Sequence, residues 1–593
     1  MSDGPDLWRP DSRAWRHTTK QQLAAWRYGH AVKNRSFDLL VVGGGLSGVA
    51  AAVAASRRGT RCAIIEESHM LGGQASTSAV AAFDITFAYE VLLNGYGLWG
   101  EIVDRLRIVY DSLGLAMNTA RYRDDSLAAN PVIIDRVLGE MVKEAGVSVF
   151  RRSKVLDAGT ARVGVSVDTD RGVFSGKYVV DATEDGALLP LLGADHRVGN
   201  LVFRDGDLGA GSADRVSIQD ITQAVTVQYY PGGLPDDLRV PEPPRYMQFR
   251  REFLGTYPYD PSGARVSDRG FAGYRATPDL SGRVAYTGSQ WEQVTRTSLN
   301  YLNDFPVQAS YLLDKDRQLQ DDRQATLKTL ALLHFLQQEV GAPWSVATDE
   351  GFAAITRPRR FADLVQFENV LKHFPPRVYM RESRRGIGID TLTAKSIFRH
   401  KNRTPARWYS DVVAVGTYPP DLHGGRAEED LEDDLDETFL DKPTTWREGP
   451  FGIPSGCLIH AGIPSLLLAE KNISVSRIVA GATRLHPTVV GIGEAVGTLA
   501  SISIRTDSHP TEVSSLQIQT SLLRNGAFPF HSAIKGLERT DSDFATVALA
   551  VIRELVPTFQ ADCAVGERVL GVERGVARTI GKDILNGAAS WDK

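Results

Sequence analysis

The sequence predicts an α/β fold, and three adjoining segments near its N-terminal end are the basis for this prediction. Residues 37–42, FDLLVV, form an apolar run typical of a buried parallel strand. An alanine-rich stretch from Leu46 to about Arg58 predicts a helix, which Gly59 can end. A second apolar run, residues 61–66, predicts another buried strand. The order strand, helix, strand is that of a βαβ unit.

The turn between the first strand and the helix has the spacing G-x-G-x-x-G, at Gly43, Gly45 and Gly48. Gly43 permits a tight turn, Gly45 lets the backbone approach a diphosphate, and Gly48 lets helix and strand pack closely. Leu46 and Ser47 open the helix, whose N-terminal N–H groups attract a phosphate anion. The unit is therefore predicted to be a Rossmann-like dinucleotide-binding domain.

Two further features refine the predicted ligand. Glu66 closes the second strand, where a carboxylate can accept hydrogen bonds from the hydroxyls of an adenosine ribose and repels a 2′-phosphate; Glu67 follows it in the same predicted site. A glycine pair then occurs in Gly72-Gly73-Gln74. It resembles the pair seen in FAD enzymes of the glutathione-reductase type, so FAD is the predicted cofactor.

Three later stretches occur in the order of one known family. They are residues 178–186 (YVVDATEDG), residues 380–385 (MRESRR) with 416–423 (GTYPPDLH), and residues 451–500, which include IVAG at 478–481, RLHP at 484–487 and GIGEAVG at 491–497. Together they resemble the bacterial FAD-dependent oxidoreductases of the FAD_oxidored type, some of which carry "xanthan lyase" labels.

This resemblance implies a glutathione-reductase-type FAD-binding domain assembled from separated blocks, with an inserted α+β substrate domain between them. The predicted boundaries are an N-terminal arm (1–36), the FAD-binding domain (37–200 and 421–507), the insert (201–420) and a small helical C-terminal region (508–593). A helix is expected within the arm, at 18–32. Further predicted FAD contacts are Val155, Ala182, Thr183, Gly186, Gly481 and Gly493.

The last of these blocks also has a physical interpretation. Residues 478–481 predict a short buried strand, at the end of which the missing side chain of Gly481 lets the backbone approach the flavin ribityl chain. The family often has an arginine after this Ala-Gly pair, and Ala482 stands there instead. A helix tightly packed on the cofactor is predicted next, with its N-terminal end toward the flavin. Its small residues are Gly491, Gly493, Ala495 and Gly497.

Only one dinucleotide fingerprint is visible, which favours hydride transfer from a small organic substrate to flavin N5, with oxygen or an external acceptor reoxidising the flavin. His486 and His423 are the candidates for proton handling. Arg484 can hold a carboxylate or the charge of the reduced flavin, and Tyr418 is a candidate pocket residue. Arg381 and Arg384, in the RESRR stretch at 381–385, can anchor an anionic substrate, although a buried network with Glu382 is the favoured interpretation.

Three alternatives remain open at this stage. A flavin-binding subunit without its own turnover is suggested by the lack of an unmistakable catalytic pair and by Ala482. An FAD-dependent monooxygenase is a second, although Gly481-Ala482 does not match the Gly-Asp pair usual in aromatic hydroxylases. An NAD-dependent dehydrogenase rests on the glycine turn and Glu66 alone, and the glycine pair after the second strand disfavours it.

Bulk composition excludes other classes. The 593 residues are too many for one hydrophobic core, so several domains are expected. A net charge of -5 gives no general attraction to nucleic acid. No apolar run predicts a membrane span, and the N-terminus lacks a signal-peptide pattern, so we expect a cytoplasmic protein. The sequence is compatible with a homo-oligomer but does not specify one.

Cysteines and acidic residues give two further expectations. The three cysteines, Cys62, Cys457 and Cys563, are far apart in sequence, which predicts neither a disulfide framework nor a metal cluster. They are expected to be small buried residues. The run EEDLEDDLDE at 428–437 predicts a solvated surface loop, and no metal site is predicted in it.

Overall fold

The computed structural model describes most of the chain from residue 34 onward. The predicted N-terminal arm, apart from residues 34–36, and its helix lie outside the described residues, as does Cys563. The described ranges are 34–84, 95–115, 117, 127–160, 164–204, 213–256, 275–280, 294–300, 302–354, 361–397, 410–425, 431–437, 450–530, 532–560 and 569–588.

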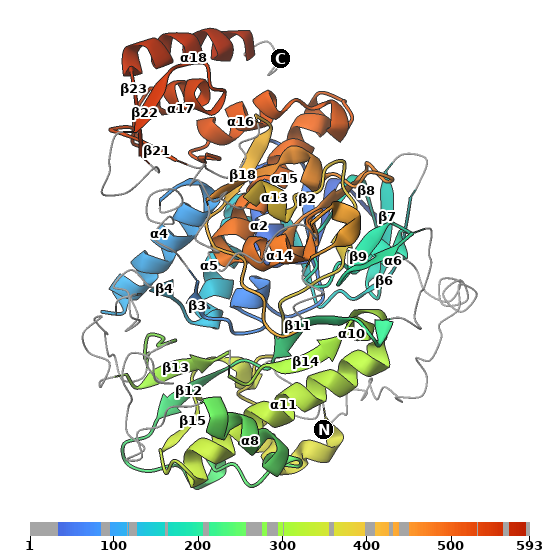
Figure 1. The fold of residues 1–593 in the computed structure, drawn as a ribbon, viewed down its shortest axis with the longest axis vertical. Coiled ribbons are helices and arrows are strands. Elements are labelled where there is room, and N and C mark those ends of the chain that lie inside the picture. The colour runs from blue at the N-terminus through green and yellow to red at the C-terminus, as the bar shows by residue number, and fades with distance from the viewer. Residues whose placement is uncertain are drawn as a thin grey trace, which may run out of the picture.

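A seven-stranded sheet forms the centre of the molecule (Figure 1). The predicted strands at 37–42 and 61–66 both belong to it. Five strands are parallel, and β7 and β6 extend the sheet in antiparallel fashion. The strands are β5 (Ser148–Arg151), β2 (Cys62–Glu66), β1 (Asn34–Val42), β8 (Gly172–Asp181), β7 (Val165–Thr169), β6 (Val155–Thr160) and β20 (Leu466–Leu468), which pairs with the end of β8.

Two buried helices pack at the centre of this domain. Helix α2 (Leu46–Ser56) follows β1, and α15 (His486–Arg505) lies directly against α2. A Cβ atom at Gly493 would lie 2.1 Å from the Ser47 carbonyl oxygen, and one at Gly497 would lie 2.1 Å from that of Ala51. The small residues predicted to pack on the cofactor therefore let two helices approach each other. Helices α4 (Gly97–Ser112) and α5 (Pro131–Glu144) and strands β3 (Ala82–Phe83) and β4 (Leu127–Ala128) complete this side.

Helix α15 is long and apolar enough to span a membrane, but 89% of its apolar window is buried within the described structure. A core helix of a folded domain passes the same test, so this finding is weak evidence for a span.

The insert has its own hydrophobic core below the central sheet (Figure 1). Its long helix α11 (Lys315–Gln338) packs against α8 (Tyr246–Thr256) and two small sheets. Those sheets are β13-β12-β15 (Arg296–Leu299, Val225–Tyr229, Trp344–Val346) and β14-β11-β16 (Phe305–Gln308, Ser217–Thr222, Tyr379–Met380). Short helices α10 (Ser310–Leu313) and α12 (Glu368–Leu371) accompany them.

The chain returns from the insert earlier than the predicted residue 420. Leu392 and Ala394 already belong to the core of the FAD-binding domain. Strand β18 (Val412–Gly416) pairs with β19 (Phe451–Pro454) in that same core. Smaller elements on this side are α6 (Leu188–Leu191), α13 (Ala394–Ile397), α14 (Arg477–Thr483), β9 (His196–Val198), β10 (Leu201–Phe203) and β17 (Arg385–Gly386).

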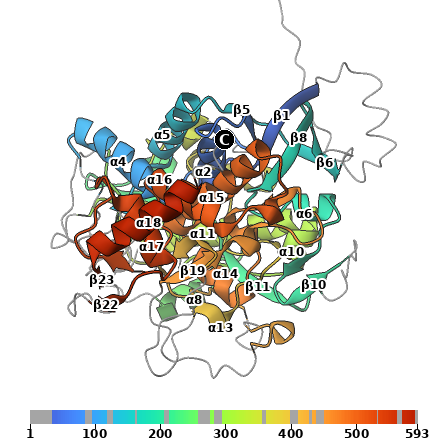
Figure 2. The ribbon, with the colours of Figure 1, turned by 90° about the horizontal axis from the view of Figure 1, so that it is seen from above.

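The C-terminal region forms a separate small core at one end of the molecule, seen from above in Figure 2. Helices α16 (Ser515–Arg524) and α17 (Phe544–Ile552) lie in the region that the sequence predicts to be helical. Contrary to the sequence prediction, the region is not purely helical, because it also contains a three-stranded sheet. One strand of this sheet precedes α17, and the other two lie between α17 and α18. These elements are β21 (Ala533–Ile534), β22 (Thr558–Gln560), β23 (Val569–Val572) and α18 (Arg574–Ala588).

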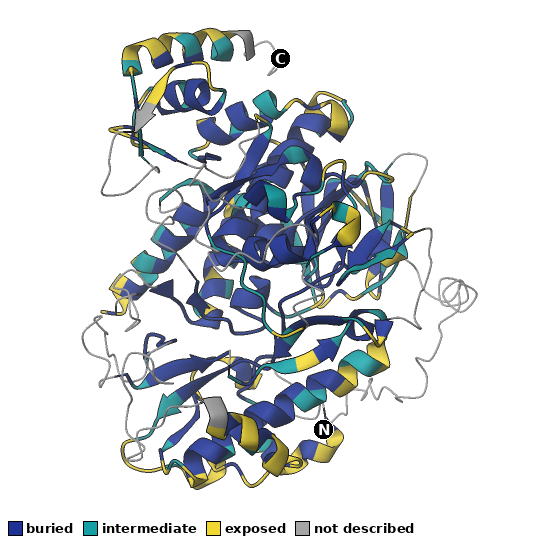
Figure 3. Ribbon diagram, in the orientation of Figure 1, coloured by how far each residue is buried: buried dark blue, intermediate teal, exposed yellow. Residues whose placement is uncertain are grey.

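The acidic run is not simply a solvated loop, which corrects the sequence prediction. Glu432 is 1% exposed and Glu437 is fully buried. Figure 3 shows how much of the central domain is buried. Glu432 accepts hydrogen bonds from the guanidinium groups of Arg197 and Arg385, at 3.1 Å and 2.9 Å. Arginines distant in sequence thus compensate carboxylates that the local sequence pattern places in water.

Residues 478–481 are also different from the prediction: they lie in helix α14 rather than in a strand. The strand that closes the sheet is β20, whose residues Leu466–Leu468 pair with Val179–Asp181 of β8. A backbone hydrogen bond from Ala469 to Asp181, 3.0 Å long, continues this pairing. The residues that follow the closing strand are therefore Glu470 and Lys471, not Gly481 and Ala482.

Candidate functional site

Three strand ends meet at one edge of the central sheet and form what we call the cradle: the turns at 43–48 and 72–74 together with residues 182–184 and 469–471. β1, β8 and β20 all end there, and ligands of open α/β sheets bind at the carboxyl ends of the strands. The Ala182 N–H donates to the Val42 carbonyl at 2.8 Å, which links the first two ends.

The glycine turn is built for close backbone packing. Gly43 has φ +101°, and a Cβ there would lie 2.1 Å from the Ala182 carbonyl oxygen. A Cβ at Gly48 would lie 2.0 Å from the carbonyl oxygen of Gly43. Both positions exclude any side chain, as the spacing predicts. At Gly186, φ is +65° and a Cβ would lie 2.8 Å from the Arg384 carbonyl oxygen, so this glycine packs against the arginine segment.

One end of the cradle is formed by Glu66. Its carboxylate accepts hydrogen bonds from the N–H groups of Gly44 and Ser68, both at 2.6 Å. The Gly72 N–H donates to the Gly44 carbonyl at 2.8 Å, so the glycine pair docks on the first turn. Glu67 is paired with Arg377 at 3.0 Å. Val155 is half-buried at the start of β6.

The centre of the cradle holds two carboxylates of the chain itself. Glu470 Oε2 accepts a hydrogen bond from the Ser47 N–H at 3.2 Å, and the Glu470 N–H donates to the Ser47 hydroxyl at 2.9 Å. Glu184 Oε1 accepts from the Gln74 N–H at 2.9 Å. The buried ammonium group of Lys471 forms an ion pair with Glu184. A Cβ at Gly45 would lie 3.4 Å from an oxygen of each carboxylate.

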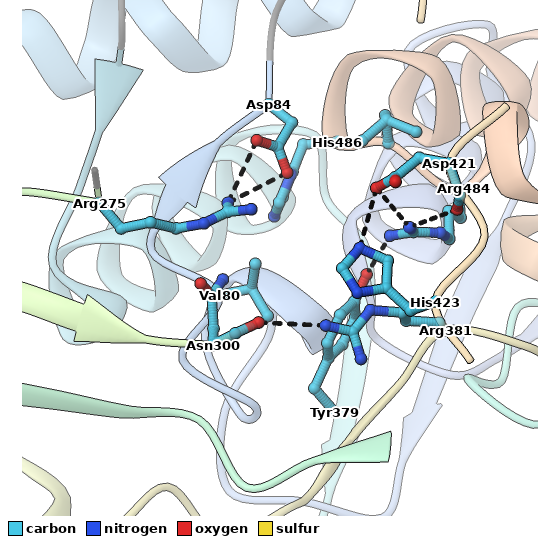
Figure 4. A pocket seen from close by; sticks show the side chains of 11 residues that line it. Val80, Asp84, Arg275, Asn300, Tyr379, Arg381, Asp421, His423, Arg484 and His486 are labelled. Atoms are coloured by element: carbon cyan, nitrogen blue, oxygen red, sulfur yellow. Dashed lines mark hydrogen bonds and ion pairs between the residues drawn. The ribbon is translucent and has the colours of Figure 1, made fainter. Parts of the chain in front are cut away.

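A small charged pocket lies beside the cradle, between the FAD-binding domain and the insert (Figure 4). Lys471 connects the two sites, since its ammonium lies 5.7 Å from the ring centroid of Tyr379 in the pocket wall. We call this the interdomain pocket; the charged and aromatic residues that line it are Asp84, Arg275, Tyr379, Arg381, Asp421, His423, Arg484 and His486.

His486 is a buried residue of this pocket, at the first position of α15. Its ring packs against Phe83 with 4.9 Å between the centroids, and neither ring nitrogen has a partner at hydrogen-bond geometry among the described residues. Burial lowers the pKa of His486 to about 4, and Asp84 only partly opposes the shift. The imidazole is therefore neutral near pH 7 and can accept a proton.

His423 and Arg484 are held by carboxylates. His423 contacts Asp304 through Nδ1 at 2.8 Å and Asp421 through Nε2 at 3.1 Å. Burial alone would lower the pKa of His423, but these two hydrogen bonds outweigh it and raise the pKa. Arg484 donates to the Tyr379 hydroxyl at 2.8 Å and to Asp421 at 3.0 Å. Both residues thus position the walls of the pocket.

The remaining predicted residues are placed as follows. Tyr418 is half-buried and is not among the residues that line the pocket. Thr183 donates its hydroxyl to Asp181 at 2.7 Å and so stabilises the turn after β8. A Cβ at Gly481 would lie 3.1 Å from the Asp421 backbone, which makes this glycine a packing position beside the pocket rather than the end of a strand. Gly493 packs against α2, as described above.

Arg381 belongs to a buried network, as expected, but its partner is Asp304 and not the predicted Glu382. Its guanidinium donates to Asp304 at 2.9 Å and to the Asn300 carbonyl at 3.1 Å, which joins the RESRR stretch to the insert. Glu382 lies 3.5 Å from Arg477. The sequence analysis did not identify Glu184, Glu470, Lys471, Asp84 and Arg275 as site residues. The first three are charged residues within three positions of the end of an apolar strand, and that pattern is the signal that could have found them.

Among the described residues, neither the cysteines nor the potential metal ligands form a functional site. Cys62 and Cys457 are buried and unpaired, and burial raises the pKa of the Cys62 thiol to about 12. Within the described ranges, no group of three histidine, cysteine, aspartate or glutamate side chains is arranged to hold a metal ion.

Fold and site together define a dinucleotide-binding α/β protein with a polar pocket beside its cradle. A family profile described as "FAD dependent oxidoreductase" (FAD_oxidored) matches residues 38–522. The chain belongs to this FAD dependent oxidoreductase family, and FAD is its cofactor. A search of curated proteins finds no match.

Several solved structures are similar to part of the chain. They include NikD, an amino acid oxidase essential for nikkomycin biosynthesis (17% identity, TM-score 0.22, 34% of this chain and 60% of that chain). L-proline dehydrogenase from P. horikoshii gives 14% identity, TM-score 0.24, and coverage of 34% and 62%. THI4 from Thermovibrio ammonificans gives 21%, 0.19, and coverage of 26% and 61%. The match thus spans about three fifths of each of these proteins.

The cradle fits the adenosine ribose of FAD but not its diphosphate. Glu66 and the glycine turn suit the adenosine ribose, as in other dinucleotide folds. The position where a diphosphate would meet the N-terminus of α2 is taken by the carboxylates of Glu470 and Glu184. Two carboxylates and a diphosphate repel each other and cannot share this space, so the side chains as they stand do not fit the diphosphate.

Proposed function

We propose that the chain oxidises a small organic substrate that carries an anionic group and binds in the interdomain pocket. Three guanidinium groups, of Arg275, Arg381 and Arg484, line the pocket and suit a carboxylate or similar anion. Each guanidinium is paired with one carboxylate, Arg275 with Asp84, Arg381 with Asp304 and Arg484 with Asp421, so an anionic substrate would share these donors with the chain's own carboxylates. FAD supplies two-electron chemistry to this family.

The observation that carries the proposal is the buried imidazole of His486, whose ring nitrogens meet no partner at full hydrogen-bond geometry among the described residues and have only the Val80 backbone close by. A buried polar group without a partner costs stability, so its retention in a pocket wall points to a ligand. A neutral imidazole accepts the proton that the substrate releases as it is oxidised. His423 and Arg484 orient the opposite wall through Asp421.

An anaerobic screen tests this proposal. FAD-loaded protein is mixed with small metabolites in two sets, one anionic and one uncharged or purely cationic, and bleaching of the flavin absorbance is followed. We expect bleaching by members of the anionic set only. Bleaching by uncharged compounds alone, or by neither set, would contradict the proposed substrate class.

A further inference from the structure

The carboxylates in the cradle carry a further inference. We propose that Glu470 and Glu184 form an internal mimic of a diphosphate, which occupies the cradle of the FAD-free chain and which FAD must displace in order to bind. The geometry, the charge balance and the backbone at Glu470 support this independently.

Glu470 takes the position of a bound anion at a helix N-terminus. Its Oε2 accepts the Ser47 N–H at the first turn of α2, the kind of N–H group that holds a phosphate in dinucleotide folds. Its Oε1 is buried and has no hydrogen-bond partner in the described part of the chain. The site therefore holds an anion with unused acceptor capacity.

Glu184 takes a second anionic position a short distance away. A Cβ atom added at Gly73 would lie 2.1 Å from Glu184 Oε1, and one added at Gly45 would lie 3.4 Å from it. Glu184 therefore fills the space that both glycines leave open. Lys471 neutralises this carboxylate. When both carboxylates are ionised, they and the one ammonium leave a net charge of about -1 in the cradle, where a diphosphate requires positive charge.

The backbone shows that Glu470 occupies a position suited to glycine. Its φ is +54°, a left-handed conformation that side chains other than glycine rarely adopt. The strand end β20 and the reciprocal hydrogen bonds with Ser47 hold it there. Glycine at 470 would relax the backbone and remove one of the two carboxylates from the cradle, so the substitution is compatible with the fold.

Protonation of Glu470 determines whether FAD binding strengthens or weakens as the pH is lowered. Burial and the Glu184 carboxylate raise the pKa of Glu470, while Lys471 and the Ser47 N–H oppose the shift. A lower pH thus neutralises this carboxylate and weakens its repulsion of a diphosphate. The titratable groups that face Glu470 or its partners are Glu184, Lys471, Glu66, Arg377, Tyr379 and His486.

The test is an FAD titration of the purified full chain, with the change in FAD fluorescence as the readout. We expect Glu470→Gly to bind FAD at least about tenfold more tightly than wild type. Wild-type affinity should rise as the pH is lowered from about 9 to about 6, and Glu470→Gln should lose most of this dependence. Glu184→Gly in the Glu470→Gly background keeps the test valid should one carboxylate suffice to block the cradle.

Asp436→Gly is the matched control. Asp436 is also a carboxylate at positive φ, +58°, but its side chain is 79% exposed and pairs with Lys395. We expect it to leave FAD affinity unchanged. The proposal would be overturned if neither Glu470→Gly nor the double variant bound FAD more tightly than wild type. This includes the case in which neither variant binds FAD at all. No substrate takes part, so this outcome is independent of whether the proposed oxidation is correct.

Discussion

Glu432→Ala is expected to lower the free energy of unfolding by about 3–5 kcal/mol, because it leaves a buried arginine without its counter-ion. Glu432 and Arg385 both have fully buried side chains, 2.9 Å apart. Arg197 lies 3.1 Å from the same carboxylate, and the Arg477 N–H donates to it at 2.6 Å. This carboxylate therefore links the strand after β8, the RESRR stretch and the start of α14.

Urea denaturation measures this effect, and Asp434→Ala is the control within the same segment. Asp434 pairs with Arg197 but is 48% exposed, so its loss should cost no more than about 1 kcal/mol. If both variants were equally stable, the acidic run would be the solvated loop that its sequence alone suggests, and the buried network would not contribute to stability.

His486→Asn is expected to slow substrate-driven flavin reduction by about 10²–10⁴-fold, because the proton acceptor is removed. The pKa of about 4 means that wild-type His486 is already neutral above about pH 5, so its contribution should be constant toward alkaline pH and decline only in acid. The measurement is stopped-flow reduction of FAD-loaded protein by the compound that the screen identifies.

The control for this variant is His509→Asn. His509 precedes the short helical turn Pro510–Glu512 and does not line the pocket. FAD content, measured by absorbance, should be unchanged in both variants, since His486 makes no hydrogen bond to the cradle. A reduction rate equal to wild type in His486→Asn would remove this residue from the mechanism.

The first part of the fold could be predicted because its signals are local. The βαβ unit, the turn at 43–48 and Glu66 lie within one short stretch, where spacing alone determines the geometry. The prediction of a strand at 478–481 was wrong because a four-residue apolar run occurs in buried helices and strands alike. The acidic run misled for another reason: its buried partners, Arg197 and Arg385, are brought to it only by the tertiary fold.

The cradle and the pocket could be predicted only in part for the same reason. His486, His423 and Arg484 were identified from their motifs, and all three line the interdomain pocket. Glu184 and Glu470 follow strands that are adjacent in the sheet but far apart in the sequence. Nothing in either local sequence shows that the two carboxylates meet at the turn of Gly45, so the filled cradle emerges only from the fold.

A structure of the chain determined with bound FAD tests the central claim most directly. In that structure we expect the diphosphate to contact the N–H groups of residues 45–47 and the adenosine ribose to contact Glu66. The Glu470 carboxylate should then point away from Ser47. FAD bound while Glu470 keeps its hydrogen bond to Ser47, or bound at a different edge of the sheet, would contradict both the site and the competition inferred for it.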